Sequence, residues 1–269
     1  MSAVPPKPRL DDGTGVVRAL LALRPLVEAT PLASGGGRLT LGLATATEPA
    51  LRPAGPTEEQ LCAGHLPARA RTFLSGRAAL RRALARAGQP GGATAEIPYE
   101  ADGFRPRLPR GSVGSLSHSG GVAVALAAPA ARCAGLGVDL ERHPLPQAAG
   151  RVVLSGKEQL FLTGEFGDFG GPGELGVLGA DAACERRLRE LFSAKESAYK
   201  ALYGLLPPPQ RPTTLLGIAI RPVPGGFAAR ARRAPERVLH VHACWADGAV
   251  LTWTAVEVAA ADCPPGVSG

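Results

Sequence analysis

Two carboxylates lie two residues apart in the segment GVDLE, where Asp139 and Glu141 fall on what the sequence predicts to be a strand. Alternate residues of a strand point to the same face, so both carboxylates share one face while Val138 and Leu140 point into the core. Neighbouring carboxylates repel each other unless a cation lies between them. The pair therefore indicates either a metal site or an ordinary exposed strand face, and the spacing alone leaves both open.

A second group of charged side chains lies in LFSAKESAYKALYG, residues 191–204. The chain has 30 Lys and Arg residues but only four lysines, and two of the four, Lys195 and Lys200, are here. Glu196 and Lys200 are four residues apart on the expected helix, a spacing that most often forms a surface ion pair. Lys195 is in line with the apolar stripe, so it must extend past that stripe to water or meet an anion. One helix thus presents a carboxylate and two ammonium groups along its inward edge.

The segment GSLSHSGG, residues 114–121, places Ser117 and His118 just before another expected strand. A turn rich in Ser, His and Gly can donate hydrogen bonds to a phosphate. The same composition is equally typical of a structural turn. The G-x-S-x-G pattern of a hydrolase nucleophile is absent from this segment.

Three potential zinc ligands, His240, His242 and Cys244, alternate along a further expected strand and share one face. A structural zinc site needs four ligands, and no fourth ligand is spaced nearby. Alternate strand positions commonly hold buried His and Cys. The pattern therefore favours packing over zinc binding.

Positive charge is concentrated in one part of the chain. The formal net charge is +7, and between Pro67 and Arg110 nine arginines accompany only Glu96, Glu100 and Asp102. Such a patch favours phosphates, nucleic acid or an acidic protein, and it is also consistent with a solvated helix. No aromatic stacking platform or DNA-reading motif accompanies it, so we expect no nucleic-acid partner.

Periodicity and turn signals predict the elements that position these residues. The expected elements are helices over 67–87 and from 181 to about 203, strands over 121–128 and 135–143, a hairpin within 237–258, and a glycine-rich loop over 164–179. Two capping boxes, Thr57 with Gln60 and Ser155 with Glu158, indicate further helix starts. The order of elements indicates an α+β fold, since no G-x-G-x-x-G follows a strand.

The length of 269 residues suits two comparable lobes, and we expect these over 15–135 and 136–259, with flexible tails over 1–14 and 260–269. The five cysteines are scattered without a C-x-x-C pair, which predicts free thiols. The sequence shows neither an export signal nor a membrane span. We therefore expect a cytoplasmic monomer that does not bind membranes.

Four segments carry a resemblance to a known family: GRAALRRAL, GSLSHSGGVAVAL, GVDLE and LFSAKESAYKAL, in this order. Together they resemble a 4′-phosphopantetheinyl transferase of the surfactin type, and FSAKESAYKAL is most similar to the enterobactin-synthase branch. The resemblance covers about residues 57–205, and its specific motifs are the paired GVDLE and KESAYK. It implies two similar, pseudo-symmetric α/β lobes with the active site in the cleft between them.

The resemblance also implies an activity. The 4′-phosphopantetheine arm of coenzyme A is moved, with Mg²⁺, to a serine of an acidic apo acyl or peptidyl carrier protein in polyketide, nonribosomal peptide or siderophore synthesis. The implied catalytic residues are Glu196, Lys200 and Asp139, and the implied metal ligands are Asp139, Glu141 and Glu196. The implied coenzyme A contacts are Arg69, Arg77, Ser117, His118, Lys195 and Lys200. The alternative is a non-catalytic module that binds coenzyme A or another phosphate ligand.

The segment YEADGFRPRLP, residues 99–109, departs from the family pattern. Many relatives carry a basic residue near the adenine here, whereas this chain has Glu100 and Asp102. Arg105 and Arg107 are the two candidates to replace that residue.

Overall fold

The computed structural model describes residues 13–32, 38–163 and 180–258. Its strands form two antiparallel sheets. The first, in the order β1-β3-β2, contains β1 (Thr40–Thr45), β2 (Ser112–Ser119) and β3 (Val122–Pro129). The second, in the order β4-β8-β7-β6-β5, contains β4 (Cys133–Glu141), β5 (Ile218–Val223), β6 (Gly226–Ala231), β7 (Ala234–Ala246) and β8 (Ala249–Glu257).

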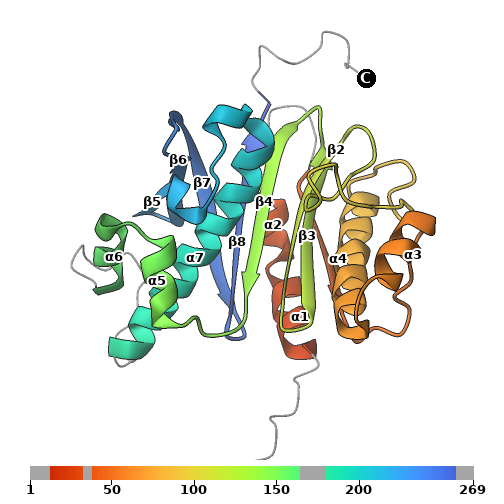
Figure 1. The fold of residues 1–269 in the computed structure, drawn as a ribbon, viewed down its shortest axis with the longest axis horizontal. Coiled ribbons are helices and arrows are strands. Elements are labelled where there is room, and N and C mark those ends of the chain that lie inside the picture. The colour runs from red at the N-terminus through yellow and green to blue at the C-terminus, as the bar shows by residue number, and fades with distance from the viewer. Residues whose placement is uncertain (1–12, 33–37, 164–179, 259–269) are drawn as a thin grey trace, which may run out of the picture.

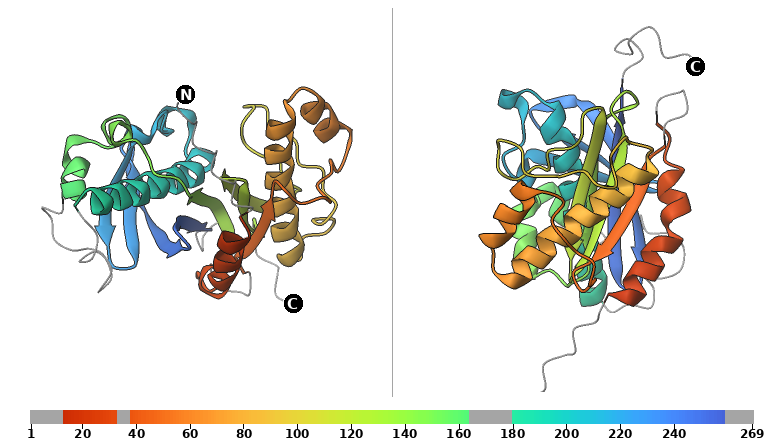
Figure 2. Two further views of the ribbon diagram at one scale, coloured as in Figure 1. Left: turned by 90° about the horizontal axis from the view of Figure 1, so that it is seen from below. Right: turned by 90° about the vertical axis from the view of Figure 1, so that its right-hand side faces the viewer.

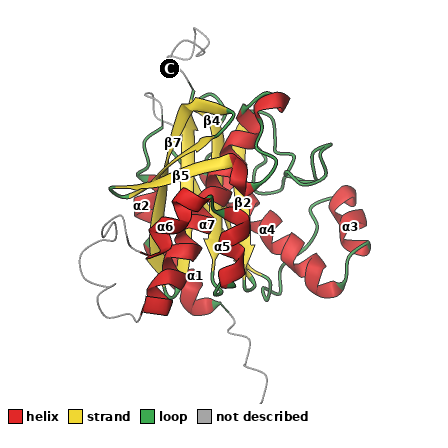
Figure 3. Ribbon diagram, turned by 60° about the vertical axis from the view of Figure 1, so that its left-hand side comes forward, coloured by secondary structure: helices red, strands yellow, loops and turns green. Residues whose placement is uncertain are grey.

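Helices pack against these sheets and against one another. They are α1 (Thr14–Ala22), α2 (Arg24–Glu28), α3 (Pro56–Ala63), α4 (Pro67–Arg86), α5 (Gln147–Val153), α6 (Gly156–Thr163) and α7 (Ala180–Leu205), with 3₁₀ turns η2 (Pro208–Gln210) and η3 (Leu215–Gly217). β2, β3 and β4 lie at the centre, with α4 on one side and α7 on the other (Figure 1). The view from below shows α7 lying across the larger sheet (Figure 2), and Figure 3 shows α5, α6 and α7 on the same side of the molecule. The α+β fold class is confirmed.

Each sheet has one long helix packed against it, and we call each sheet together with its helices a lobe. The inner face of α4 is alanine-rich and meets the alanines of β3, with Leu80 and Leu84 fully buried. The inner face of α7 follows the helical period, with Leu188, Leu191 and Leu202 packed on β5, β6 and β7. The predicted helices over 67–87 and from 181 to about 203 are therefore confirmed, as is the apolar stripe of the second.

A glycine lets each long helix approach a strand closely. Gly42 on β1 faces the backbone of α4, and a Cβ atom there would overlap the carbonyl oxygen of Ala79. Gly137 on β4 faces the backbone of α7, and a Cβ atom there would overlap the carbonyl oxygen of Ser197. The two lobes thus repeat one packing arrangement, as the pseudo-symmetric fold requires.

Three serines of β2 join the lobes. β2 and β4 belong to different sheets, but the Val138 amide donates to Ser115 Oγ (3.1 Å) and the Arg142 amide donates to Ser119 Oγ (3.1 Å). Between them, Ser117 Oγ donates to Asp139 Oδ1 at 2.8 Å. We call this set of contacts the serine junction. It fixes which residues of one lobe face which residues of the other.

Two local predictions are wrong. The segment 114–121 is not a turn, because β2 continues to Ser119 and the chain reverses only at Gly120 and Gly121, both with positive φ. The alternating serines of the junction need the extended backbone. The capping box at Thr57 is also wrong, because α3 begins at Pro56 and the Thr57 amide donates to Glu96 Oε1 at 2.6 Å.

Other local predictions are confirmed. The hairpin turns at Asp247 and Gly248, which both have positive φ. One half of the second capping box is present, since the Ser155 amide donates to Glu158 Oε2 at 2.7 Å. The four cysteines within the described ranges, Cys62, Cys133, Cys184 and Cys244, are free thiols, whereas Cys263 lies outside those ranges.

The glycine-rich segment 164–179 and most of both expected tails also lie outside the described ranges. The predicted domain boundary at 135–136 remains a prediction. Among the helices that the structure describes, none has the length and apolarity needed to cross a bilayer.

Candidate active site

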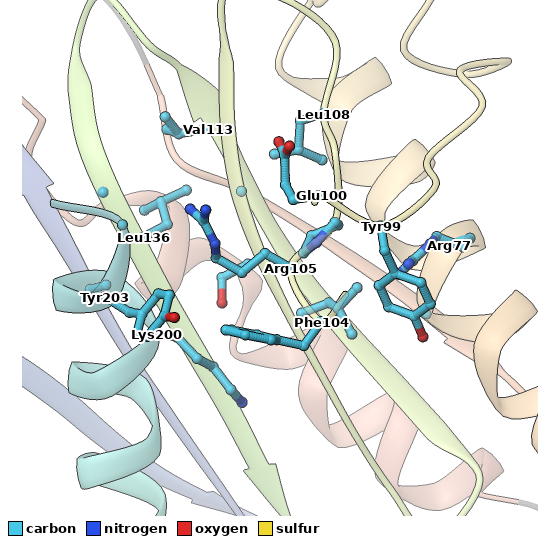
Figure 4. A pocket seen from close by; sticks show the side chains of 18 of the residues that line it. Arg77, Tyr99, Glu100, Phe104, Arg105, Leu108, Val113, Leu136, Lys200 and Tyr203 are labelled. Carbon is cyan, nitrogen blue, oxygen red and sulfur yellow. The ribbon is translucent and has the colours of Figure 1, made fainter. Parts of the chain in front are cut away.

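A cavity of about 670 Å³ opens between the lobes. One wall is formed by α4 and the 99–108 segment, and the other by β2, the start of β4 and α7. Lys200 and Tyr203 project from α7, while Arg77 and Tyr99 lie on the opposite wall (Figure 4). Five of the predicted site residues line this cavity: Arg69, Arg77, His118, Glu196 and Lys200.

The first wall carries a buried arginine with an unused donor. Arg77 is 3% exposed, and its guanidinium carbon lies 4.4 Å from the ring centroid of Phe73 and 4.8 Å from that of Tyr99. Nε donates to the Ile97 carbonyl at 2.5 Å, but Nη2 is buried without a hydrogen-bond partner. Burial lowers the pKa of Arg77 from its ordinary value. An anion in the cavity would satisfy the unpaired donor, and Arg69 lines the same cavity.

Behind the second wall, Asp139 lies in a network of donors and does not itself line the cavity. Asp139 is 3% exposed; its Oδ1 accepts from Ser117 (2.8 Å) and from Lys200 (2.7 Å), and its Oδ2 accepts from Ser193 (2.9 Å). Lys200 Nζ also lies 4.0 Å from Glu196 Oε2. The predicted residues Asp139, Ser117, Glu196 and Lys200 are therefore brought together.

Asp139, Glu141 and Glu196 concentrate negative charge on this side of the cavity, and of the three only Glu196 lines it. Burial raises the pKa of Glu141 to about 7, and repulsion from Asp139 and Glu196 adds to the effect. Burial also raises the pKa of Glu196, which Asp139 raises further and Lys200 opposes. Carboxylate oxygens are preferred ligands of hard divalent cations, and such a cation would relieve this repulsion. The donor set therefore fits a divalent cation.

No group of three or more His, Cys, Asp or Glu side chains in the described part of the chain is already arranged as a metal site. For Asp139, the absence of a formed metal site agrees with the hydrogen-bond donors that already surround both of its carboxylate oxygens. On β7, the ring of His242 stacks on Trp253 at 5.0 Å and lies 4.5 Å from that of His240. Packing is thus the observed role of the β7 histidines.

The raised pKa of Glu141 predicts a pH-dependent stability. With the ordinary value of 4.5 for the unfolded chain and about 7 for the folded protein, the folded state binds more protons between these values. The contribution of Glu141 to stability is therefore complete below pH 4.5 and is lost as the pH rises to about 7. Urea unfolding in EDTA should show the wild type losing stability relative to Glu141→Gln across this window. If the unfolding free energies of wild type and Glu141→Gln changed equally with pH, the prediction would be contradicted.

The prediction that Lys195 faces the cleft is wrong. Lys195 is 0% exposed, and its Nζ donates to Glu158 (2.7 Å), to the Val153 carbonyl (2.7 Å) and to the Leu215 carbonyl (3.3 Å). Successive side chains of a helix are rotated by about 100°, so Lys195 and Glu196 point in different directions. The anion that pairs with Lys195 is Glu158, which lies in the same lobe.

Ser117 does not line the cavity, since its hydroxyl is directed to Asp139. His118, the next residue of β2, points to the other side and lines the cavity at an exposed position. Of the two candidates in the 99–109 segment, Arg105 lines the cavity and Arg107 does not. Arg105 Nε donates to Asp102, and the guanidinium carbon lies 5.6 Å from the ring centroid of Tyr203.

Aromatic residues at the cavity were missed by the motif analysis. The chain has three tyrosines, and all of them, Tyr99, Tyr199 and Tyr203, line this cavity. Phe104 lies against Tyr203, with ring centroids 5.2 Å apart, and is 51% exposed. The available signal was the presence of tyrosines beside charged motifs in a chain that is only 4% aromatic.

The fold and site together define an α+β protein with a cleft that has arginines on one wall and a glutamate with a lysine on the other. Residues 57–128 match the family model described as the 4′-phosphopantetheinyl transferase N-terminal domain. The chain is 33% identical over 217 residues to the 4′-phosphopantetheinyl transferase Svp of Streptomyces mobaraensis, covering 76% of this chain and 78% of that protein. It is 34% identical over 151 residues to the 4′-phosphopantetheinyl transferase Npt of Nocardia iowensis, covering 56% of this chain and 59% of that protein. The chain belongs to the 4′-phosphopantetheinyl transferase family and is a transferase.

Proposed function

We propose that the protein transfers the 4′-phosphopantetheine arm of coenzyme A to a serine of an apo acyl or peptidyl carrier protein and releases 3′,5′-ADP. The observation that carries this proposal is the cleft itself, where Arg77 and Arg69 face Lys200 and Glu196. Coenzyme A has a terminal 3′-phosphate and a diphosphate, and this cleft has cationic groups on both walls. The family relationship does not favour a module that binds the ligand without transferring it.

The cationic side chains divide between the phosphates. Arg77, with its buried and unpaired Nη2, and Arg69 would hold the 3′-phosphate, since a forked guanidinium suits a terminal phosphate. Lys200 and His118 would contact the diphosphate from the other wall. Arg105, placed beside Tyr203, is the proposed basic residue near the adenine.

The reaction exchanges one phosphorus–oxygen bond for another. The carrier serine oxygen attacks the phosphorus that bears the pantetheine, and the bond from that phosphorus to the bridging diphosphate oxygen breaks. Glu196 takes the serine proton, directly or through water, and its burial-raised pKa favours this role. Lys200 neutralises charge on the departing 3′,5′-ADP, and the rest of the rate enhancement comes from alignment.

Asp139, Glu141 and Glu196 are the residues that would hold a divalent cation, proposed to be Mg²⁺. When bound, the cation supplies Lewis-acid neutralisation of the diphosphate oxygens.

The finer assignments belong to the same proposal. The subtype is the surfactin type, nearest the enterobactin-synthase branch, and the pathway is polyketide, nonribosomal peptide or siderophore synthesis. The carrier is acidic, because nine arginines between Pro67 and Arg110 outnumber three acidic residues. The protein acts as a cytoplasmic monomer.

Intact-protein mass spectrometry tests the function. An apo carrier protein incubated with the enzyme, coenzyme A and Mg²⁺ should gain about 340 Da, the mass of one phosphopantetheine, and the gain should disappear with EDTA. Absence of any gain across several carrier classes, with coenzyme A still bound, would overturn the transfer assignment in favour of a binding module.

Arg77→Lys tests the 3′-phosphate assignment. The substitution keeps a positive charge but loses the forked geometry, so the KM for coenzyme A should rise roughly tenfold. The KM for 3′-dephospho-coenzyme A, which lacks the proposed partner, should be the same for wild type and variant. An equal rise for both substrates would show that Arg77 does not contact the 3′-phosphate.

A further inference from the structure

A chain of hydrogen-bonded, buried hydroxyl groups lies behind Asp139. Ser193 and Ser197 on α7 and Thr252 on β8 are 0% exposed, and Thr252 is the cross-strand partner of Asp139. Hydroxyls buried this completely need hydrogen-bond partners, because an unpaired one costs stability. All three find them in one another, in nearby carbonyls and in Asp139.

The distances connect the hydroxyls in sequence. Ser197 Oγ lies 2.7 Å from Thr252 Oγ1 and 3.0 Å from the Thr252 carbonyl oxygen. Thr252 Oγ1 lies 2.9 Å from Ser193 Oγ and 2.8 Å from the Ser193 carbonyl oxygen. Ser193 Oγ lies 2.9 Å from Asp139 Oδ2.

Counting the hydroxyl protons shows in which direction the hydrogen bonds of this hydroxyl chain run. A carboxylate only accepts, so the single hydroxyl proton of Ser193 goes to Asp139, and Ser193 Oγ can only accept from Thr252. The proton of Thr252 then points toward Ser193, to its Oγ or its carbonyl oxygen. The proton of Ser197 points toward Thr252 in the same way. When each hydroxyl bonds the next hydroxyl, every donor is directed toward Asp139, and aligned donors in a low-dielectric interior strengthen one another.

The two oxygens of Asp139 differ as a result. Oδ2 contacts the buried hydroxyl chain through Ser193, whereas Oδ1 accepts from Ser117 and from the ammonium of Lys200, whose side chain is 26% exposed. We propose that Ser193, backed by Thr252, is a positioning residue that fixes Oδ2 and so keeps Oδ1 directed at the reaction site. This inference rests on the proposed function, in which Asp139 serves the transfer.

Ser193→Ala tests the role directly. Removing a hydrogen bond to a charged group should lower kcat roughly 10- to 100-fold, while the KM for coenzyme A stays within about twofold, because the phosphate contacts are untouched. The rise in Tm caused by coenzyme A alone should persist, whereas the additional rise caused by Mg²⁺ should shrink. A kcat within about twofold of wild type would overturn the inference.

A pair of variants at Thr252 separates positioning from folding. Thr252→Ser keeps the hydroxyl and should retain the wild-type kcat, whereas the nearly isosteric Thr252→Val removes the donor and should lower kcat at unchanged KM. Equal kcat values for the two variants would overturn the inference even if Ser193→Ala failed to fold. Wild-type enzyme measured in parallel distinguishes the two failures: no transfer by wild type defeats the proposed function, whereas transfer that is insensitive to Thr252→Val defeats only this inference.

Discussion

Glu196→Gln is expected to lower the transfer rate by roughly 10²- to 10⁴-fold without disturbing the fold. Glu196 lines the cavity beside Lys200, with its Oε2 4.0 Å from Nζ, and its side chain is 28% exposed. The substitution preserves shape but removes both the proposed proton acceptor and one carboxylate of the proposed cation site. Single-turnover transfer to a carrier protein, followed by mass spectrometry, measures the loss, and thermal unfolding checks the fold.

Glu185→Gln is the matched control on the same helix. Glu185 pairs with Arg189 at 2.7 Å on α7 and does not line the cavity. Its replacement should leave the transfer rate within about twofold of wild type, since partly exposed ion pairs contribute little. If Glu196→Gln transferred as fast as this control, neither the base role nor the metal-ligand role of Glu196 would stand.

Gly137→Ala is expected to destabilise the protein by about 3 kcal/mol, the upper part of the usual range for overpacking. The added methyl group would meet backbone atoms of α7 at Ser197 and Ala201, which cannot move without moving the helix. For a protein of this size the loss corresponds to a Tm lower by roughly 6–12 °C. Urea and thermal unfolding measure both quantities. The same shift of α7 should also misalign Glu196 and Lys200, so activity should fall below the level explained by unfolding.

Gly156→Ala provides the comparison for this prediction. A Cβ atom at Gly156, the first residue of α6, meets nothing within 4 Å. Alanine there should be neutral or stabilise by up to about 1 kcal/mol through the unfolded chain. A Tm for Gly137→Ala equal to that of Gly156→Ala would mean that α7 and β4 can separate at little cost.

Local patterns in the sequence were sufficient for the elements with strong periodicity. The apolar period of α4 and α7, the uncharged run of β3 and the Asp-Gly turn of the hairpin are signals contained within a few residues. The motif residues Asp139, Glu196 and Lys200 follow from the same reasoning, because a strand period and a helix period fix the faces on which they lie. That these three residues lie together on one side of the cleft then followed from the family resemblance.

The errors share a physical cause, which is a partner distant in the chain. Lys195 needed an anion, as its apolar position indicated, but that anion is Glu158, which is 37 residues away. The first turn of α3 is capped by Glu96, which is 39 residues from Thr57. Spacing reveals that a charge needs a partner, but only the tertiary structure determines which one it finds.

The serine junction has a thermodynamic consequence for the ligand. Residues of both lobes line the cavity, and the lobes are held together at β2 and β4 by side-chain hydroxyls, so any ligand that contacts both lobes adds contacts across the same boundary. Ligand binding and the association of the two lobes are then thermodynamically linked, so each makes the free energy of the other more favourable by the same amount. Under the proposed function, coenzyme A bound in this cleft would strengthen the association of the two lobes, and its release would return that association to what the protein alone provides.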